Sequence, residues 1–140
     1  RYAGMGLKDL GDQMWEHLRK SRQGHWQAQA YASLPQPVLK PRHAFQRLMA
    51  GDVERVPLAE MAGRVVTVGV IPYPPGIPIV MPGENIGAAD GPWLTYLRTL
   101  QEYGHRFPGF AKEVEGAEEH EGQFHVQCLK PAAAKGGARS

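Results

Sequence analysis

Cysteine is nearly absent from this sequence: Cys128 is the single one among 140 residues. An internal disulfide and a Cys-x-x-Cys metal or redox site are both excluded, so a reducing, cytoplasmic location is expected. Excess charge is lacking too, because 16 basic and 14 acidic residues leave a formal net charge of +2. Because the basic and acidic residues are so nearly balanced, the charge gives no indication of a nucleic-acid partner. No apolar run approaches the roughly 20 residues of a membrane-spanning helix, so neither a membrane span nor a signal peptide is predicted.

The length and the 42% hydrophobic content fit one compact domain with a modest core. Arg1 is not preceded by a methionine, so we expect this chain to be a fragment of a longer protein. The closing residues, 132–140, are small, polar and rich in glycine, and a disordered tail is expected there.

Prolines concentrate in the segment 64–84, at positions 72, 74, 75, 78 and 82. Each proline fixes φ, removes a backbone donor and keeps the preceding residue out of the α region, so no helix can pass through. A flexible linker would be polar, whereas the residues between these prolines are mostly apolar. The segment is therefore predicted to be extended, and either buried or facing a ligand.

Three helices are predicted from apolar spacing and from the residues at their ends. The first covers about 8–20, with one apolar stripe made of Leu7, Leu10, Met14, Trp15 and Leu18. The second covers about 41–50 and ends at Gly51, with an inner face made of Ala44, Phe45, Leu48 and Met49. The third covers about 92–103, with Asp90 as N-cap and Gly104 as its end. Residues 26–32 are expected to form either a weaker helix or an irregular stretch.

Strands are predicted at 64–71, which is rich in β-branched residues, and at 123–129, where Phe124, Val126 and Cys128 alternate on one face. Residues 57–62 read as a short helical turn, and the acidic stretch 116–122 reads as a loop. This mixture predicts an α+β fold, a small single domain of a few helices packed on a short irregular sheet. The histidines match no zinc spacing, so no metal site is predicted.

Several short sequence motifs in this chain occur together in one known family. They are Leu34-Pro35, Pro41-Arg42-His43-Ala44-Phe45, Val56-Pro57-Leu58, Gly63-Arg64, Pro72-Tyr73-Pro74-Pro75-Gly76-Ile77-Pro78, Met81-Pro82-Gly83-Glu84, Phe107-Pro108-Gly109-Phe110 and Cys128-Leu129. In this order and spacing, the chain resembles the C-terminal domain of the bacterial ornithine/lysine/arginine decarboxylases. The resemblance divides the chain into a helical lead-in at 1–33, the domain at 34–131 and the tail.

The resemblance implies a decarboxylase that depends on pyridoxal phosphate and acts on a basic amino acid, with the N-terminal catalytic domain of the same protein and further copies of the chain as partners. The family's cofactor lysine follows a Ser-x-His pattern, which precedes none of the lysines here. The cofactor is therefore expected in the complete enzyme and not on this segment, which alone is predicted to be inactive. The choice among lysine, arginine and ornithine stays open.

The site residues expected from the resemblance are contacts, with no catalytic, cofactor or metal role. Tyr73, Pro74, Pro75 and Gly76 form either a rigid wall near the mouth of the active-site channel or a purely structural interdomain plug. Glu84 is either aimed at a cationic group or a surface or capping carboxylate. The alternative function is a stand-alone binding or oligomerisation module that keeps the fold without activity.

Overall fold

The structure is a computed structural model that describes residues 2–132. The helices are α1 (Leu7–Ser21), α2 (Gln23–Ala32), α3 (Pro41–Met49) and α4 (Pro92–Arg106), with a 3-10 turn, η1, at Leu58–Glu60. The strands are β1 (Gln36–Pro37), β2 (Val53–Pro57), β3 (Ile71–Pro72), β4 (Glu84–Asn85), β5 (Val114–Glu115), β6 (Ala117–His120) and β7 (Gln123–Leu129). The predicted α+β class is confirmed. The predicted tail at 132–140 lies, apart from residue 132, outside the described residues.

The largest sheet has three antiparallel strands in the order β2-β7-β6. In β7 the side chains of Phe124, Val126 and Cys128 are buried, as the alternation predicted. The prediction of a loop at 116–122 is wrong, because β6 pairs with β7 as a hairpin. The side chains of β6 are mostly exposed, which is why its acidic composition resembles that of a loop. The backbone hydrogen bonds to β7 make it a strand.

α4 is the central helix of the core. Its buried residues are Trp93, Leu94, Tyr96, Leu97, Thr99, Leu100 and Tyr103. Two predictions about its ends are wrong, because Gly91 is the N-cap and the helix continues through Gly104 to Arg106. At Gly104 an added Cβ would lie 3.2 Å from the Cβ of Ala111. This glycine therefore allows close packing inside the helix and does not end it.

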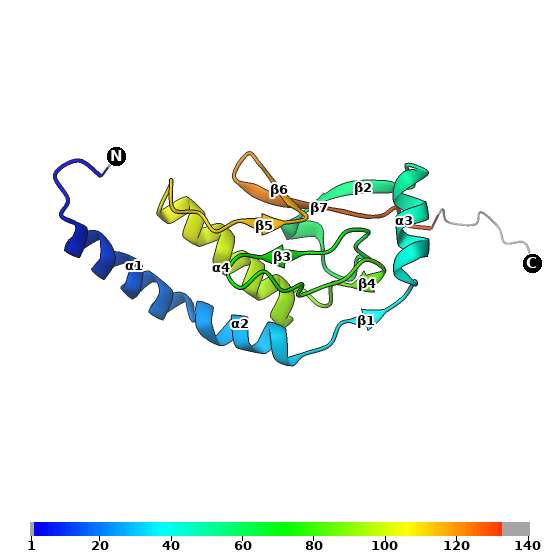
Figure 1. The fold of residues 1–140 in the computed structure, drawn as a ribbon, viewed down its shortest axis with the longest axis horizontal. Helices are drawn as coiled ribbons and strands as arrows, with labels where there is room; N and C mark the ends of the chain where they lie inside the picture. Colours follow the sequence, from blue (N-terminus) through cyan, green and yellow to red (C-terminus); the bar gives the residue numbers. More distant parts are fainter. Residues whose placement is uncertain (1, 133–140) are drawn as a thin grey trace, which may run out of the picture.

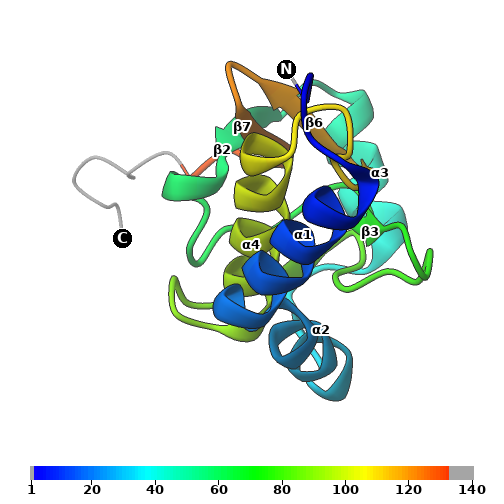
Figure 2. The same ribbon diagram turned by 90° about the vertical axis from the view of Figure 1, so that its left-hand side faces the viewer.

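α1 and α2 follow one another along the lower side of the domain in Figure 1, and α1 lies alongside α4 in Figure 2. Arg22, with φ of 55°, separates them. The predicted single stripe on α1 is only partly right: Leu10 packs with Tyr103 and Phe107, whereas Leu7 and Trp15 are 89% and 69% exposed. The weaker helical signal at 26–32 corresponds to α2, whose Ala30 lies in the main core.

α3 begins at Pro41 and ends just before Gly51, as predicted. Its predicted inner face is wrong for two of four residues, because Phe45 is 58% exposed and Met49 is 71% exposed. α3 lies at the end of the domain opposite the start of α1 (Figure 1), and only Ala44 is buried on it. Apolar spacing finds the helix but does not distinguish a face that packs from one that faces outward.

The predicted strand at 64–71 is not continuous. Val65, Val66 and Val70 each form a single bridge, with Asn85, Cys128 and Val80 respectively. Because it bridges three different partners over six residues, this stretch connects the sheets and is not a strand of its own, although Val66, Thr67 and Val70 are buried as in a strand. The strand β2 was missed, because its VERVP sequence includes two charged residues and a proline. These features are tolerated since β2 lies at the edge of its sheet.

Candidate functional site

The segment from the start of β3 to the end of β4, residues 71–85, is called here the proline loop. Strand pairing fixes it at both ends. β3 pairs with β5 and β4 pairs with β1. Inside the loop, Ile79 N donates to Val70 O at 2.9 Å, and Val70 N donates to Val80 O at 3.0 Å. Ile79 and Val80 are 4% and 0% exposed. The loop is therefore anchored in the core by its second half, which leaves its first half as a projecting tip.

The tip is built around Tyr73. The aromatic ring lies against Gly76, where φ is +82° and an added Cβ would be 2.7 Å from Tyr73 Cε1. The Tyr73 hydroxyl donates to Glu115 Oε2 at 3.1 Å, and its backbone N donates to Glu113 O at 2.8 Å. The bond to the Glu115 carboxylate raises the pKa of Tyr73. Gly76 is thus required by the ring next to it, which holds the turn in one shape.

The outer surface of the tip is apolar and open. Tyr73 is 41% exposed and Ile77 is 55% exposed, and Pro74 and Pro75 between them are also exposed. On the other side, the Tyr31 hydroxyl of α2 donates to Ile77 O at 2.9 Å. The structure therefore brings the predicted contact residues 73–76 together on one rigid, exposed projection.

Glu84 is turned into its own loop. Its Oε2 accepts a hydrogen bond from Met81 N at 2.7 Å, and its backbone N donates to Met81 O at 3.1 Å. Among the residues that the structure describes, no cation forms an ion pair with it. This geometry is that of the capping carboxylate, the second of the two expected roles. Glu84 does not lie with the tip residues.

No candidate metal site and no reactive cysteine is found in the described part of the chain. Within residues 2–132 there is no group of three or more His, Cys, Asp and Glu side chains placed to hold a metal ion. Cys128 is 0% exposed, and burial raises the pKa of its thiol to about 12, as for an inert core residue. No helix of the described residues is long and apolar enough to cross a membrane.

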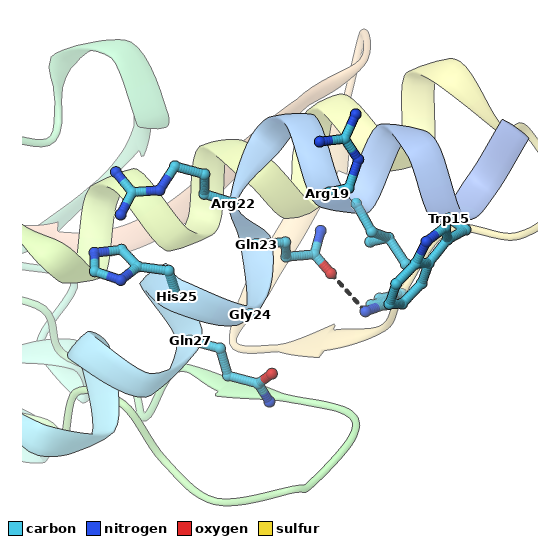
Figure 3. Close-up of a pocket in the computed structure, with 9 residues that line it drawn as sticks. Trp15, Arg19, Arg22, Gln23, Gly24, His25 and Gln27 are labelled. Carbon is cyan, nitrogen blue, oxygen red and sulfur yellow. Dashed lines mark hydrogen bonds between the residues drawn. The ribbon is translucent and has the colours of Figure 1, made fainter.

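One pocket was missed by reasoning from the sequence. It lies between α1 and α2, where Gln23 Oε1 accepts a hydrogen bond from Lys112 at 2.6 Å (Figure 3). Its residues come from the stretch 15–27 and from the distant Lys112, and no local spacing could have indicated that these two parts meet. The proline loop, by contrast, was visible in the sequence because its residues are contiguous.

Comparison with known proteins identifies the fold's family. The family model described as Orn/Lys/Arg decarboxylase, C-terminal domain matches residues 24–130. The chain belongs to this family. The decarboxylase C-terminal domain accounts for every element from α2 to β7, including the proline loop.

The relatives of this decarboxylase domain are much longer proteins. It is 43% identical to the biodegradative arginine decarboxylase of Escherichia coli K12, over 92% of this chain and 17% of that protein. It is 37% identical to the lysine decarboxylase LdcA of Pseudomonas aeruginosa, over 93% of this chain and 18% of that protein. Solved structures agree: LdcA matches with a TM-score of 0.84 over 93% of this chain and 18% of the solved chain. LdcF of Francisella novicida also matches with a TM-score of 0.84, at 31% identity over 92% of this chain and 18% of that one.

Proposed function

We propose that this chain is the C-terminal domain of a decarboxylase that converts lysine, arginine or ornithine into the corresponding amine and carbon dioxide. The observation that carries the proposal is the family match over residues 24–130, together with relatives that are named arginine, lysine and ornithine decarboxylases. Because the chain spans only 17% to 18% of the first two relatives' length, the reaction itself is assigned to the remainder of such a protein.

Pyridoxal phosphate is the cofactor that the family resemblance implies, and it supplies an electron sink for decarboxylation. Its site needs a lysine for the covalent link and an acidic partner for the ring nitrogen. Lys112 is the half-buried lysine near a pocket, and no Asp or Glu is among the described residues that line that pocket. The residues present do not fit the cofactor, so we assign it to the N-terminal catalytic domain.

The proline loop is proposed as a contact with that catalytic domain, made by Tyr73, Pro74, Pro75 and Gly76 and closed at its base by the Glu84 cap. Its exposed tip is apolar, which favours burial against another surface. Its backbone is already fixed by prolines and by hydrogen bonds to the Glu113 carbonyl and the Tyr31 hydroxyl, so docking removes little conformational freedom. The same tip is proposed to help shape the mouth of the active-site channel.

The enzymatic part of the proposal is tested on the complete protein, with carbon dioxide release measured from lysine, arginine and ornithine across a range of pH. One of the three is expected to be turned over by pyridoxal-phosphate-loaded protein, while the 140-residue chain alone is inactive. Complete protein that binds no pyridoxal phosphate and releases no carbon dioxide would instead favour the stand-alone binding or oligomerisation module.

The docking role is tested by placing a charge on the tip. Ile77→Asp in the complete protein is expected to loosen the C-terminal domain, seen as faster proteolysis at its boundary and weaker assembly of the expected homo-oligomer. Met49→Asp is the matched control, since Met49 is also exposed and apolar but lies on α3. Equal behaviour of the two variants would argue against docking by the tip.

A further inference from the structure

The pocket at Lys112 is a candidate for a second function, separate from the proline loop. It has a volume of about 420 Å³ and opens between α1, the start of α2 and the chain after α4. That volume lies within the range of small-molecule sites in proteins. Three cationic side chains line it: Arg19 of α1, which is paired with Glu16 at 2.9 Å, Arg22 between α1 and α2, and Lys112 after α4. None of the described residues that line it is an Asp or a Glu.

Lys112 is held in place by an amide and not by a carboxylate. Its Nζ donates to Gln23 Oε1 at 2.6 Å. Gln23 is only 3% exposed, and its Nε2 donates to Thr99 O at 3.3 Å, which turns Oε1 toward the lysine. The Lys112 ammonium also lies 5.5 Å from the centre of the Tyr103 ring. The side chain is therefore positioned by neighbours that carry no negative charge.

The charge of Lys112 is left without a counter-charge inside the described chain. No Asp or Glu of residues 2–132 forms an ion pair with it. Burial lowers the pKa of Lys112, which reflects the cost of keeping the ammonium partly out of water. One amide oxygen leaves two of its three N–H donors for another partner. An anion entering the pocket would remove this cost.

Two other pockets of the described residues hold their cations differently. The pocket beside α3 contains Arg47 and Arg64, which are paired with Asp52 and Glu54, and also Lys130, which is exposed to solvent. The pocket on the other side of α1 is lined by cations together with Asp12 and Glu16. Among these three pockets, the Lys112 pocket is therefore the one whose lysine is partly buried and has no carboxylate partner among the described residues.

The rim adds an aromatic surface. Trp15 is 69% exposed, and its indole forms one side of the pocket. In Figure 3 the side chain of Gln23 lies between Trp15 on one side and Arg22 on the other. A ligand that contacts Lys112 would therefore also meet a flat apolar ring, whereas the Arg22 guanidinium points away from Trp15 in Figure 3 and reaches the ligand once its side chain turns.

We propose that this pocket binds a small organic oxyanion, a carboxylate or phosphate group carried on a flat apolar body. Lys112 and Arg22 contact the oxyanion, and Trp15 packs against the flat part. A charge-assisted hydrogen bond to a partly desolvated ammonium is strong, and stacking on indole adds selectivity for ring-bearing ligands. The site goes beyond the proposed decarboxylase role and needs no residue of the proline loop.

The test is calorimetric titration of the complete protein with phenyl phosphate, benzoate and inorganic phosphate. Lys112→Gln is expected to weaken whichever ring-bearing probe binds by at least about tenfold, or about 1.4 kcal/mol. Trp15→Ala is expected to weaken that probe but to leave inorganic phosphate unchanged. Lys8→Gln, which removes an exposed lysine of α1, is the matched control and is expected to change nothing. Benzoate and phenyl phosphate distinguish a carboxylate ligand from a phosphate.

Two results would overturn the proposal. One is that no ring-bearing probe binds the wild-type protein, as when an acidic side chain of the catalytic domain already fills the pocket. The other is binding that Lys112→Gln and Lys8→Gln change equally, which would place the probe elsewhere. If Lys112→Gln does not fold, Arg22→Gln replaces it, because Arg22 is exposed and its loss leaves the core intact.

Discussion

Gly83 gives a direct test of how the proline loop is held. Its φ is +91°, and a Cβ there would overlap the carbonyl oxygen of Leu39 and lie 2.9 Å from the carbonyl carbon. The Gly83 carbonyl oxygen accepts hydrogen bonds from Val38 N at 2.9 Å and Leu39 N at 3.0 Å. Gly51 is the matched control, since its φ is +74° but nothing lies within 4 Å of an added Cβ. Both alanine variants therefore carry the strain of a positive φ, and only Gly83→Ala adds a clash with the Leu39 backbone.

The expected free-energy changes follow from these contacts. Alanine at a left-handed position costs about 1 kcal/mol, which is the whole effect expected for Gly51→Ala. In Gly83→Ala the Leu39 backbone must also move away, which disrupts two hydrogen bonds worth about 1 kcal/mol each. The total expected for Gly83→Ala is therefore about 3 kcal/mol.

Urea unfolding of the 140-residue chain measures the difference. With a slope of about 2 kcal/mol per molar urea, Gly83→Ala is expected to unfold about 1 M earlier than Gly51→Ala. The slope itself is expected to stay unchanged. Equal midpoints for the two variants would refute the claim that the loop approaches the Leu39 backbone this closely.

Three further outcomes are expected from the structure. Leu97→Ala is expected to destabilise the chain by about 2–5 kcal/mol, because Leu97 is 0% exposed in the centre of α4, whereas Met49→Ala should stay within about 0.5 kcal/mol in the same urea assay. Tyr73→Phe is expected to cost less than about 1 kcal/mol, since the lost bond to Glu115 is exposed; a larger change in the urea midpoint would mean that this bond is worth more than its exposure indicates. Stability is expected to fall as pH rises from 9.0 toward about 12, because over this range the folded Cys128 thiol keeps a proton that the unfolded chain releases. Urea midpoints measured across that range should fall less steeply for Cys128→Ala, and identical slopes would contradict this account.

The parts of the fold that could be predicted are those whose signal is local. The alternation of Phe124, Val126 and Cys128 specifies β7, and the apolar spacing around Leu97 specifies α4. The predictions are wrong where contact with a distant part of the chain determines the local structure. Gly104 looks like a helix end until Ala111 is known to pack against it.

The same distinction applies to the candidate sites. The proline loop is contiguous, so Tyr73 and Gly76 were found as neighbours in sequence, although the ring lying over the glycine was not foreseen. Lys112 and Gln23 are 89 residues apart, and only the packing of α2 along α4 brings them together. The exposure of apolar side chains could not be predicted from the sequence either. The apolar spacing that includes Phe45 on α3 is the same whether that face of the helix is covered or exposed.

Because Tyr73 and Gly76 are in contact, the residues acceptable at one of these positions depend on the residue at the other. Any side chain at 76 must displace the Tyr73 ring and adopt a positive φ, so few substitutions are expected when position 76 is varied alone in a mutant library. If the ring is first removed by Tyr73→Ser, Asn becomes acceptable at 76, because Asn tolerates positive φ better than other side chains do. Among homologous sequences, a residue other than glycine at the position of Gly76 is therefore expected only where the position of Tyr73 has lost its aromatic ring.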